Sequence, residues 1–355
     1  MNGERIPAAI LGGTGYVAGE AIRLLAPHPG FALTMVVSES RAGERIDGIF
    51  PHLAGLVGEL RFTPPAALAD LLTVAPRVAL VSAAPHGASA TAVAAAIAAA
   101  ERARGELAVV DLSADFRFAD PADYAAVYGH PHATPELLPR FARGLPEQLA
   151  HPAARWIAHP GCFSTAVLLA VVPLLASGLV DPRFAVAAIT GSTGSGRTPN
   201  AKTHHPERRS NVVAYQPLVH RHAPEMRAFA AAATGIAPEI DFVPISGPYA
   251  RGIYATVQTR LAAAGATARE LHAALANAYA GSPFVTVGHE PPSLTEVVGT
   301  NRARIGVALA GDAVAVTVAI DNLVKGAAGG AVQWLNRLFG RPEDEGLQLP
   351  GLGWL

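Results

Sequence analysis

The stretch Ala-Ala-Ile-Leu-Gly-Gly-Thr-Gly-Tyr-Val-Ala at residues 8–18 decides the fold. A short apolar run ends in a glycine-rich turn, and a helical pattern follows directly, which is the order of a mononucleotide-binding unit. Glycines let the chain turn tightly and let backbone N–H groups approach an anion, which the helix N-terminus favours electrostatically. The stretch therefore predicts a Rossmann-type domain that binds a dinucleotide, with contacts from Gly12, Thr14, Gly15, Tyr16 and Val17.

Alternating strand and helix signals continue beyond this stretch. Pro27 to Gly30 ends the first helix, and Phe31 to Val37 is the second strand. Val78 to Ser82 and Leu107 to Leu112 are two further buried strands, separated by an alanine-rich helix from Ser89 to about Ala100. Such alternation predicts an α/β fold with a doubly wound parallel sheet.

After about residue 180 the pattern changes to α+β, with a mixed sheet. Only one clear helix, from Thr267 to Ala280, interrupts these strands, and a final helix is predicted from Asn322 to Phe339. The expected strands are 184–190, 240–245, 253–259, 305–309 and 313–320.

Composition excludes several classes of protein. In 355 residues, 27 lysines and arginines face 28 aspartates and glutamates, so there is no basic excess for nucleic acid or a membrane surface. A single cysteine excludes an internal disulfide and is typical of a reducing compartment. The first residues lack the long apolar core of a signal peptide, so we expect a cytoplasmic protein.

The uncharged stretch from Cys162 to Val180 approaches the about 20 apolar residues that span a bilayer. Pro173, Ser177 and Gly178 lie within it, and no cluster of lysine or arginine flanks it. We therefore expect a buried core helix and no membrane partner.

The end of the second strand distinguishes between nicotinamide cofactors. An NAD site usually has an acidic residue here, whereas this chain has Ser38, Glu39, Ser40 and Arg41. Two hydroxyls and a guanidinium suit a 2′-phosphate, so NADP is preferred. A solvated loop is the alternative.

Cys162 lies directly before the long apolar helix. A thiol at a helix N-terminus lies near unpaired N–H groups and the positive end of the dipole, which favour the thiolate. The residue is therefore a candidate nucleophile. The alternative is that a lone cysteine simply packs as a small hydrophobic residue.

The densest group of histidines is His220 and His222, followed by Glu225. In an extended segment the two imidazoles would point to one face, with the carboxylate close enough to orient one of them. His204 and His205 form a second cluster. Together with Cys162, His220 and His222 could form a zinc ligand set, but no spacing matches an established metal motif, so no metal is expected.

Two loops are candidates for holding an anionic substrate. Residues 191–197, Gly-Ser-Thr-Gly-Ser-Gly-Arg, form a hydroxyl-rich loop suited to an anion-binding nest. Residues 111–117, Asp-Leu-Ser-Ala-Asp-Phe-Arg, end in an arginine that we expect to be exposed and able to hold a phosphate or carboxylate. Ordinary loop and ion-pair architecture is the alternative for both.

Eight short strings along nearly the whole chain resemble the N-acetyl-gamma-glutamyl-phosphate reductase family, within the aspartate-semialdehyde dehydrogenase-like group. They are Gly-Gly-Thr-Gly-Tyr at 12–16, Pro-His-Gly at 85–87, the string at 111–117, Gly-Leu-Pro-Glu at 144–147, His-Pro-Gly-Cys at 159–162, His-Arg-His-Ala-Pro-Glu at 220–225, Arg-Gly-Ile at 251–253 and Asp-Asn-Leu-Val-Lys-Gly at 321–326.

The resemblance implies a Rossmann NADP-binding domain over 1–160, completed by the C-terminal helix at 322–355, and a catalytic and oligomerisation domain over 161–321. It implies that Cys162 is the nucleophile and that His220 or His222 is the acid/base, with His220 favoured and Glu225 in support. Further implied cofactor contacts are Pro85, His86, Ser192, Gly194 and Asn322, the last near the nicotinamide carboxamide. Implied substrate contacts are Ser113, Arg117, Ser164, Arg197, His204 and Arg251.

The implied reaction is NADPH-dependent conversion of an acyl phosphate to an aldehyde through a cysteine thioester, in arginine biosynthesis, by a homodimer or homotetramer. Phe163-Ser164 stands where the family commonly has Tyr-Pro, and the loop at 191–197 departs from the family's usual string. The string His-His-Pro-Glu-Arg at 204–208 resembles the related reductase of lysine biosynthesis, whose aminoadipyl phosphate is attached to a small acidic carrier protein. That branch is the first alternative, and a non-catalytic NADP-binding redox sensor is the second.

Overall fold

The computed structural model describes residues 5–149, 152 and 154–353. Contacts between Cα atoms divide the chain into two compact units. Unit 1 comprises the described residues of 1–143, 151–159 and 327–348, and unit 2 those of 144–150, 160–326 and 349–355. Residues 144–149, 160, 322–326 and 349–353 thus fall in unit 2, although all of them were predicted to belong to the cofactor domain.

Unit 1 contains a seven-stranded sheet in the order β3-β2-β1-β4-β5-β7-β6. Every pairing is parallel. The order reverses direction at β1, and ligands of such sheets bind at the carboxyl ends of the strands beside that point. The strands are β1 (Ile6–Leu11), β2 (Phe31–Val37), β3 (Phe62–Thr63), β4 (Arg77–Ser82), β5 (Glu106–Asp111), β6 (Phe141–Arg143) and β7 (Trp156–Ala158).

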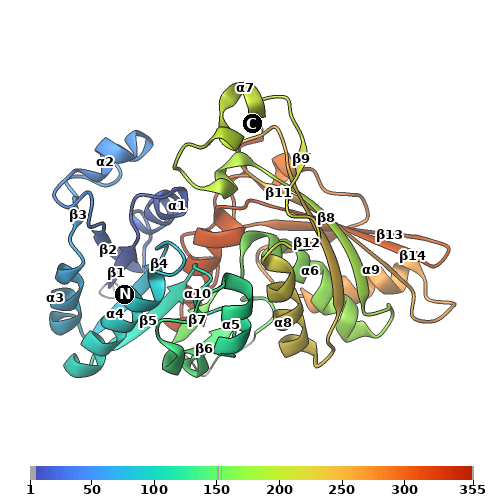
Figure 1. Ribbon diagram of the computed structural model, residues 1–355, viewed down its shortest axis with the longest axis horizontal. Helices are drawn as coiled ribbons and strands as arrows, with labels where there is room; N and C mark the ends of the chain where they lie inside the picture. Colours follow the sequence, from blue (N-terminus) through green and yellow to red (C-terminus); the bar gives the residue numbers. More distant parts are fainter. Residues whose placement is uncertain (1–4, 150–151, 153, 354–355) are drawn as a thin grey trace. The chain divides into compact units, whose positions relative to one another are not determined.

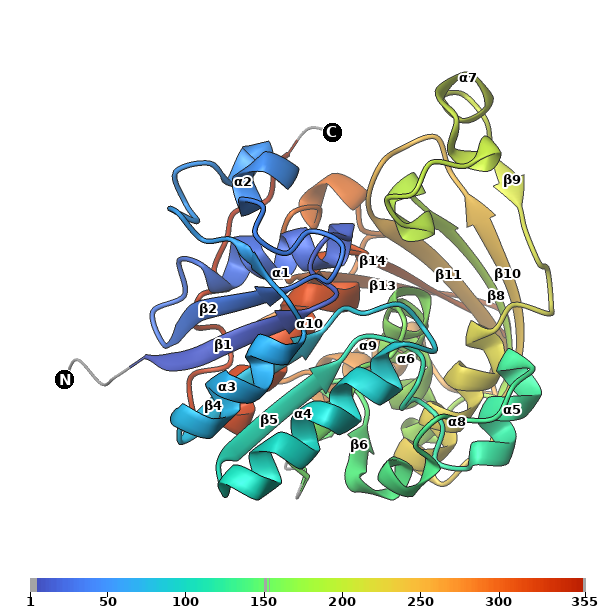
Figure 2. The same ribbon diagram turned by 60° about the vertical axis from the view of Figure 1, so that its left-hand side comes forward.

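Helices cover both faces of this sheet (Figure 2). α3 (Ala66–Val74) and α4 (Ser89–Ala103) pack on the face that carries Ala9 and Leu11. α1 (Tyr16–Leu25) and α10 (Gly329–Leu338) contact each other and pack on β1 and β5. Two shorter helices, α2 (Ile46–Ile49) and α5 (Pro121–Tyr128), lie in the connections.

Unit 2 contains a mixed seven-stranded sheet in the order β12-β13-β14-β11-β8-β10-β9 (Figure 1). The β8–β10 and β12–β13 pairs are parallel, and the other pairs are antiparallel. The strands are β8 (Arg183–Thr190), β9 (Val213–Ala214), β10 (Glu239–Ser246), β11 (Ile253–Arg260), β12 (Val285–Gly288), β13 (Ala303–Ala310) and β14 (Ala313–Ile320).

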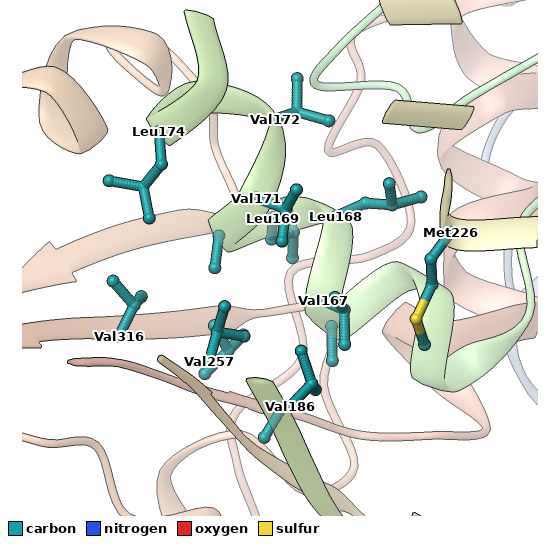
Figure 3. Packing of buried hydrophobic residues seen from close by; sticks show 14 of the residues in the cluster. Val167, Leu168, Leu169, Val171, Val172, Leu174, Val186, Met226, Val257 and Val316 are labelled. Atoms are coloured by element: carbon teal, nitrogen blue, oxygen red, sulfur yellow. The ribbon is translucent and has the colours of Figure 1, made fainter. Parts of the chain in front are cut away.

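One face of the second sheet is covered by α6 (Cys162–Ser177), α8 (His222–Thr234) and α9 (Ala268–Ala278). α6 is apolar on all sides, and every residue from Phe163 to Leu175 is buried. Figure 3 shows its valines and leucines packed against Val186, Val257 and Val316 of three strands. Because so much apolar surface is removed from water here, α6 gives its first residue, Cys162, a firmly anchored base.

The predicted fold class is confirmed, with one all-parallel and one mixed sheet. The expectation of a single helix in the second half is wrong, because α8 and the short α7 (His205–Arg208) also form there. The final helix begins later than expected, since a π-helical turn at Val324–Ala328 precedes α10. In the described part of the chain no helix is both long and apolar enough to cross a membrane.

Candidate active site

The glycine turn of unit 1 has the shape of a cradle for phosphate. Gly12 has a φ of 75°, and a Cβ there would lie 2.5 Å from the Cα of Ala84. A Cβ on Gly13 would lie 2.5 Å from the side chain of Val36. Gly15, the N-cap of α1, has open space where its Cβ would be. Two glycines therefore permit close packing, and the third leaves room in front of the N-terminus of α1.

Polar groups at the end of β2 lie where the ribose of a dinucleotide is expected. Ser38 is buried, whereas Glu39, Ser40 and Arg41 are exposed. Arg41 is paired with Glu44 at 3.2 Å, and both side chains are about half exposed. Exposed pairs of this kind contribute little to stability, so the guanidinium can exchange this partner for a phosphate at small cost.

Asp115 organises the turn that contains Pro85 and His86. Its carboxylate accepts hydrogen bonds from the N–H groups of Gly87, at 2.8 and 3.1 Å, and of Ala90, at 2.9 Å. It therefore caps the N-terminus of α4, which has no cap from its own N-cap residue. Nδ1 of His86 accepts from the N–H of Ala114 at 2.8 Å.

A buried hydroxyl network lies behind this turn. Asp111 is fully buried and accepts from the hydroxyls of Ser89, at 2.5 Å, and Ser113, at 2.6 Å. Burial raises the pKa of Asp111 to about 6, and these two hydrogen bonds oppose the rise. Ser113 is thus a structural partner of Asp111 in this network.

The expectation that Arg117 is exposed is wrong. Its residue exposure is 4%, and its guanidinium donates to the carbonyl oxygens of His159, at 3.0 Å, and Leu112, at 2.8 Å. These bonds fix the plane of the guanidinium within unit 1. Long charged side chains are rarely buried without such partners, and these carbonyl partners are brought to Arg117 only by the tertiary fold.

Cys162 is the first residue of α6, and Gly161 is its N-cap. The N–H of Gly161 donates to the buried carboxylate of Glu225 at 2.6 Å. Glu225 therefore holds the backbone immediately before the nucleophile, whereas the sequence analysis expected it to orient an imidazole. Cys162 is partly buried, and its thiol lies at the positive end of the dipole of α6.

The expectation that the two histidines lie in an extended segment is wrong, because His222 begins α8. The rings of His220 and His222 are nevertheless close, with centroids 4.8 Å apart. Both pack edge-on against Phe163, the neighbour of Cys162, at 5.9 and 6.0 Å. Tyr215 contacts the His220 ring at 5.6 Å and interacts electrostatically with Cys162. Unit 2 therefore gathers the thiol and both imidazoles in one region.

His220 has a defined protonation state. Its Nδ1 accepts the N–H of His222 at 3.1 Å, so the proton of the neutral ring is on Nε2. Burial, and secondarily the charge of Arg221, lowers the pKa of His220 to about 4. At neutral pH the ring is therefore a neutral hydrogen-bond donor through Nε2.

This lowered pKa predicts a pH dependence of stability. Below the unfolded pKa of about 6.5 the unfolded chain protonates His220 while the folded protein does not, so stability falls as the pH drops from about 6.5 towards 4. The free energy of unfolding should therefore decrease between pH 7 and pH 4.5, and we expect this decrease to be smaller by roughly 2 kcal/mol in His220→Asn than in wild type. Urea unfolding at both pH values measures it, with the exposed His130→Asn as the control. An identical pH dependence in wild type and His220→Asn would contradict the assignment.

A cavity of about 870 Å³ adjoins this region within unit 2. Its walls include Tyr215, His204, Lys202 and Arg208, so it is basic on balance, although Glu207 also contributes. Nη2 of Arg208 donates to the carbonyl oxygen of Thr190 at 3.5 Å. Its buried Nε has no hydrogen-bond partner among the described residues, which leaves a donor for an anionic ligand.

The loop at 191–197 does not form the expected anion nest. The N–H groups of Ser192 and Thr193 donate to the carbonyl oxygens of Tyr249 and Ala250, and Gly194 donates to Gly191. Asn322 holds the loop, since its Nδ2 donates to the hydroxyl of Thr193 at 3.1 Å and its Oδ1 accepts from the N–H of Gly252 at 2.7 Å. Arg197 is exposed beyond it.

Two other predicted substrate contacts differ in burial, since Arg251 is partly exposed and Ser164 is buried. Arg251 pairs with the buried carboxylate of Asp321 at 2.9 Å. Ser164, two residues after Cys162, is fully buried, and its hydroxyl has no partner in the described part of the chain. Within the described residues no group of three or more histidine, cysteine or acidic side chains is arranged to hold a metal ion.

Sequence reasoning missed Tyr215 and the cavity role of Arg208. Arg208 belongs to the His-His-Pro-Glu-Arg string but carried no spacing signal of its own. Tyr215 had no signal, because an isolated tyrosine is typical of any core. Gln216, which lines the cavity, and Leu218 have left-handed backbones (φ 46° and 66°), which the sequence did not predict either.

Two family models match the chain. The model described as semialdehyde dehydrogenase, NAD binding domain, matches residues 7–140. The model described as semialdehyde dehydrogenase, dimerisation domain, matches residues 162–322. Together they cover the glycine turn of unit 1 and, in unit 2, both Cys162 and the histidines.

Curated relatives and solved structures extend this similarity to nearly the whole chain. The N-acetyl-gamma-glutamyl-phosphate reductase of Alkalilimnicola ehrlichii is 41% identical over 98% of this chain and 99% of its own. The N-acetyl-gamma-glutamyl-phosphate reductase of Ectopseudomonas mendocina is 41% identical over 96% of this chain and 98% of its own. Aspartate semialdehyde dehydrogenase II from Vibrio cholerae has a TM-score of 0.69 at 17% identity, covering 95% of this chain and 99% of that one. The enzyme from Candida albicans, solved with NADP, has a TM-score of 0.61 at 14% identity, covering 95% and 99%.

Proposed function

The chain belongs to the N-acetyl-gamma-glutamyl-phosphate reductase family, and from this we propose that it reduces N-acetyl-gamma-glutamyl phosphate to N-acetylglutamate semialdehyde, with release of phosphate. The observation that carries the proposal is the grouping of a helix-N-terminal thiol, a neutral imidazole and a basic cavity in one unit. A reductase is favoured over a redox sensor, because a sensor needs neither the imidazole nor the cavity.

The first step uses groups of unit 2. The N-terminus of α6 stabilises the thiolate of Cys162, which attacks the acyl carbon of the substrate. The carbon–sulfur bond forms as the carbon–oxygen bond to phosphate breaks, and the departing phosphate takes up a proton from solvent. Nε2–H of His220 donates a hydrogen bond to the carbonyl oxygen, where negative charge develops. A thioester on Cys162 results.

A bound nicotinamide cofactor supplies the hydride that reduces this thioester. His220 again donates to the oxygen that becomes negative, and the carbon–sulfur bond then breaks to give the aldehyde and the thiolate. The open space beside Gly15 and the absence of acidic residues in the first turn of α1 fit a pyrophosphate at the glycine turn. Thr14, Tyr16, Val17, Pro85 and His86 remain its proposed neighbours.

We propose that the anionic groups of the substrate are recognised by the basic side of the cavity. The unsatisfied Nε of Arg208, together with Lys202 and His204, suits a carboxylate or phosphate. Ser164 and Arg197 remain candidate contacts. Asn322 acts through the loop that it anchors.

The reverse reaction tests the proposed activity. With phosphate and NADP present, we expect N-acetylglutamate semialdehyde to be oxidised much faster than its one-carbon-longer analogue, free or attached to an acidic carrier protein. Preference for the carrier-linked analogue would instead assign the enzyme to the lysine branch. No turnover with any of them would contradict the function.

We propose NADP as the cofactor, held at its 2′-phosphate by Ser38, Ser40 and Arg41. Replacement of Arg41 by alanine removes a charge-assisted contact, so we expect the KM for NADPH to rise about 10- to 100-fold while that for NADH changes little. Initial-rate kinetics with both cofactors measure this, and Arg102→Ala, at an exposed arginine of α4 in the same unit, is the control. An equal change for both cofactors would contradict recognition of the phosphate.

The uncovered face of the second sheet supports a homo-oligomer, either a homodimer or a homotetramer. Ala185 and Ala187 of β8 and Ala308 of β13 point away from the helices and are exposed. A second copy placed on this face would bury the small apolar side chains. Sedimentation velocity tests this, since Ala187→Arg should give a monomer. We also propose a cytoplasmic location, because the mechanism needs a reduced thiol.

A further inference from the structure

The backbone at Gly326 lies directly against the nucleophile. A Cβ built on Gly326 would be 2.8 Å from the Cβ and 3.1 Å from the Cα of Cys162. Real Cβ atoms essentially never approach other heavy atoms so closely, so any side chain here would displace one of the two segments. Gly326 does not have a left-handed backbone, so glycine is required here by the close approach of the chain to Cys162 and not by a turn.

The turn that carries Gly326 is held from its N-terminal side by Asp321. Oδ1 of the buried Asp321 carboxylate accepts from the N–H groups of Leu323, at 2.8 Å, and Val324, at 3.0 Å. Its carbonyl oxygen accepts the N–H of Gly326 at 3.0 Å. Arg251 neutralises the carboxylate, so the cap is itself anchored.

A buried ion pair holds the same turn from another direction. Nζ of Lys325 contacts the carboxylate of Glu147, and the two side chains are 0% and 1% exposed. The Phe284 ring lies 5.6 Å from this ammonium. Removing both charges from water is costly, and the benefit of such pairs is often a fixed arrangement of the chain and not net stability. The segment is also π-helical, and such turns occur frequently at functional sites.

We propose that Gly326 is a positioning residue for Cys162: its bare backbone, held by Asp321 and by the Lys325–Glu147 pair, fixes where the thiol lies for attack. This rests on the proposed function for its catalytic consequence. The geometric part of the inference is independent of the proposed function, because the position of the thiol can be measured without substrate.

The test is Gly326→Ala, with Gly48→Ala as the matched control. Gly48 is exposed, its added Cβ would meet open space, and its backbone is not left-handed. We expect Gly326→Ala to lower kcat about 100-fold, as misplacement of a reacting group by about 1 Å does, with KM changed less than about threefold. The midpoint of the pH–rate profile for alkylation of Cys162 should also rise. Gly48→Ala should match wild type in every measurement.

A second comparison covers the case in which Gly326→Ala folds poorly. Because the close contact is mainly with the Cβ of Cys162, the double variant Cys162→Gly, Gly326→Ala should recover most of the melting temperature that Gly326→Ala loses. Lys325→Met should lower kcat and raise the midpoint of the pH–rate profile for alkylation of Cys162. Lys325→Arg keeps the charge, so both quantities should stay close to those of wild type.

Three outcomes separate this inference from the proposed function. A folded Gly326→Ala with wild-type kcat and alkylation midpoint would overturn the positioning role while the reductase assignment stands. Equal thermal losses from Gly326→Ala in the Cys162 and Cys162→Gly backgrounds would overturn it as well. If wild type lacks reductase activity but Gly326→Ala still shifts the alkylation midpoint, the positioning role is supported and the function is wrong.

Discussion

The Cys162→Ala variant is expected to lose reduction of the acyl phosphate by a factor on the order of 10³ or more, because no other side chain can form the thioester. The methyl side chain of alanine fits wherever the cysteine does, so the fold should be retained. Steady-state rates of NADPH consumption measure the loss.

Two controls make this result specific. Circular dichroism should show an unchanged fold, and quenching of intrinsic fluorescence should show unchanged NADPH binding, since the glycine turn belongs to unit 1. Near-normal turnover by Cys162→Ala would refute the nucleophile. If the variant lost NADPH binding as well as activity, the substitution would have disturbed the cofactor site and not only the nucleophile.

The second large effect is expected at His220. Replacement by asparagine removes the Nε2–H donor, and loss of one such donor costs about 100- to 1,000-fold in kcat. Because the ring donates a hydrogen bond in both chemical steps and does not bind the ground state, KM should change little.

His222→Asn is the matched comparison, since its ring lies at 4.8 Å from that of His220 and also packs on Phe163. We expect a fall in kcat of less than about tenfold, because the N–H that orients His220 is a backbone group and survives the substitution. A larger loss in His222→Asn than in His220→Asn would assign the role to His222.

Most elements of the fold could be predicted from short stretches of the sequence. The run from Ala8 through the glycine turn predicted β1 and α1, and Phe31–Val37 is a strand with the predicted bounds. Cys162 was predicted to lie directly before the apolar helix, and in the structure it is the first residue of that helix. The family resemblance is confirmed by relatives that match over nearly the full length.

Features that depend on tertiary contacts were not predictable. α8 was missed because His220 to His222 were interpreted as an extended segment, although Ala223, Met226, Phe229 and Ala230 have helical spacing and are the residues that α8 buries. The burial of Arg117 and the pairing of Arg251 with Asp321 follow from partners distant in sequence. Likewise, Glu147 and Lys325 appeared only as members of two separate strings, 178 residues apart.

The most direct measurement of the central claim is a single turnover without phosphate. Wild-type protein mixed with NADP and N-acetylglutamate semialdehyde should form one equivalent of NADPH per chain and then stop, because the thioester has no phosphate to accept the acyl group. Mass spectrometry should then find the acyl group on the peptide that contains Cys162. Absence of the burst, or an acyl group on any other residue, would contradict the account.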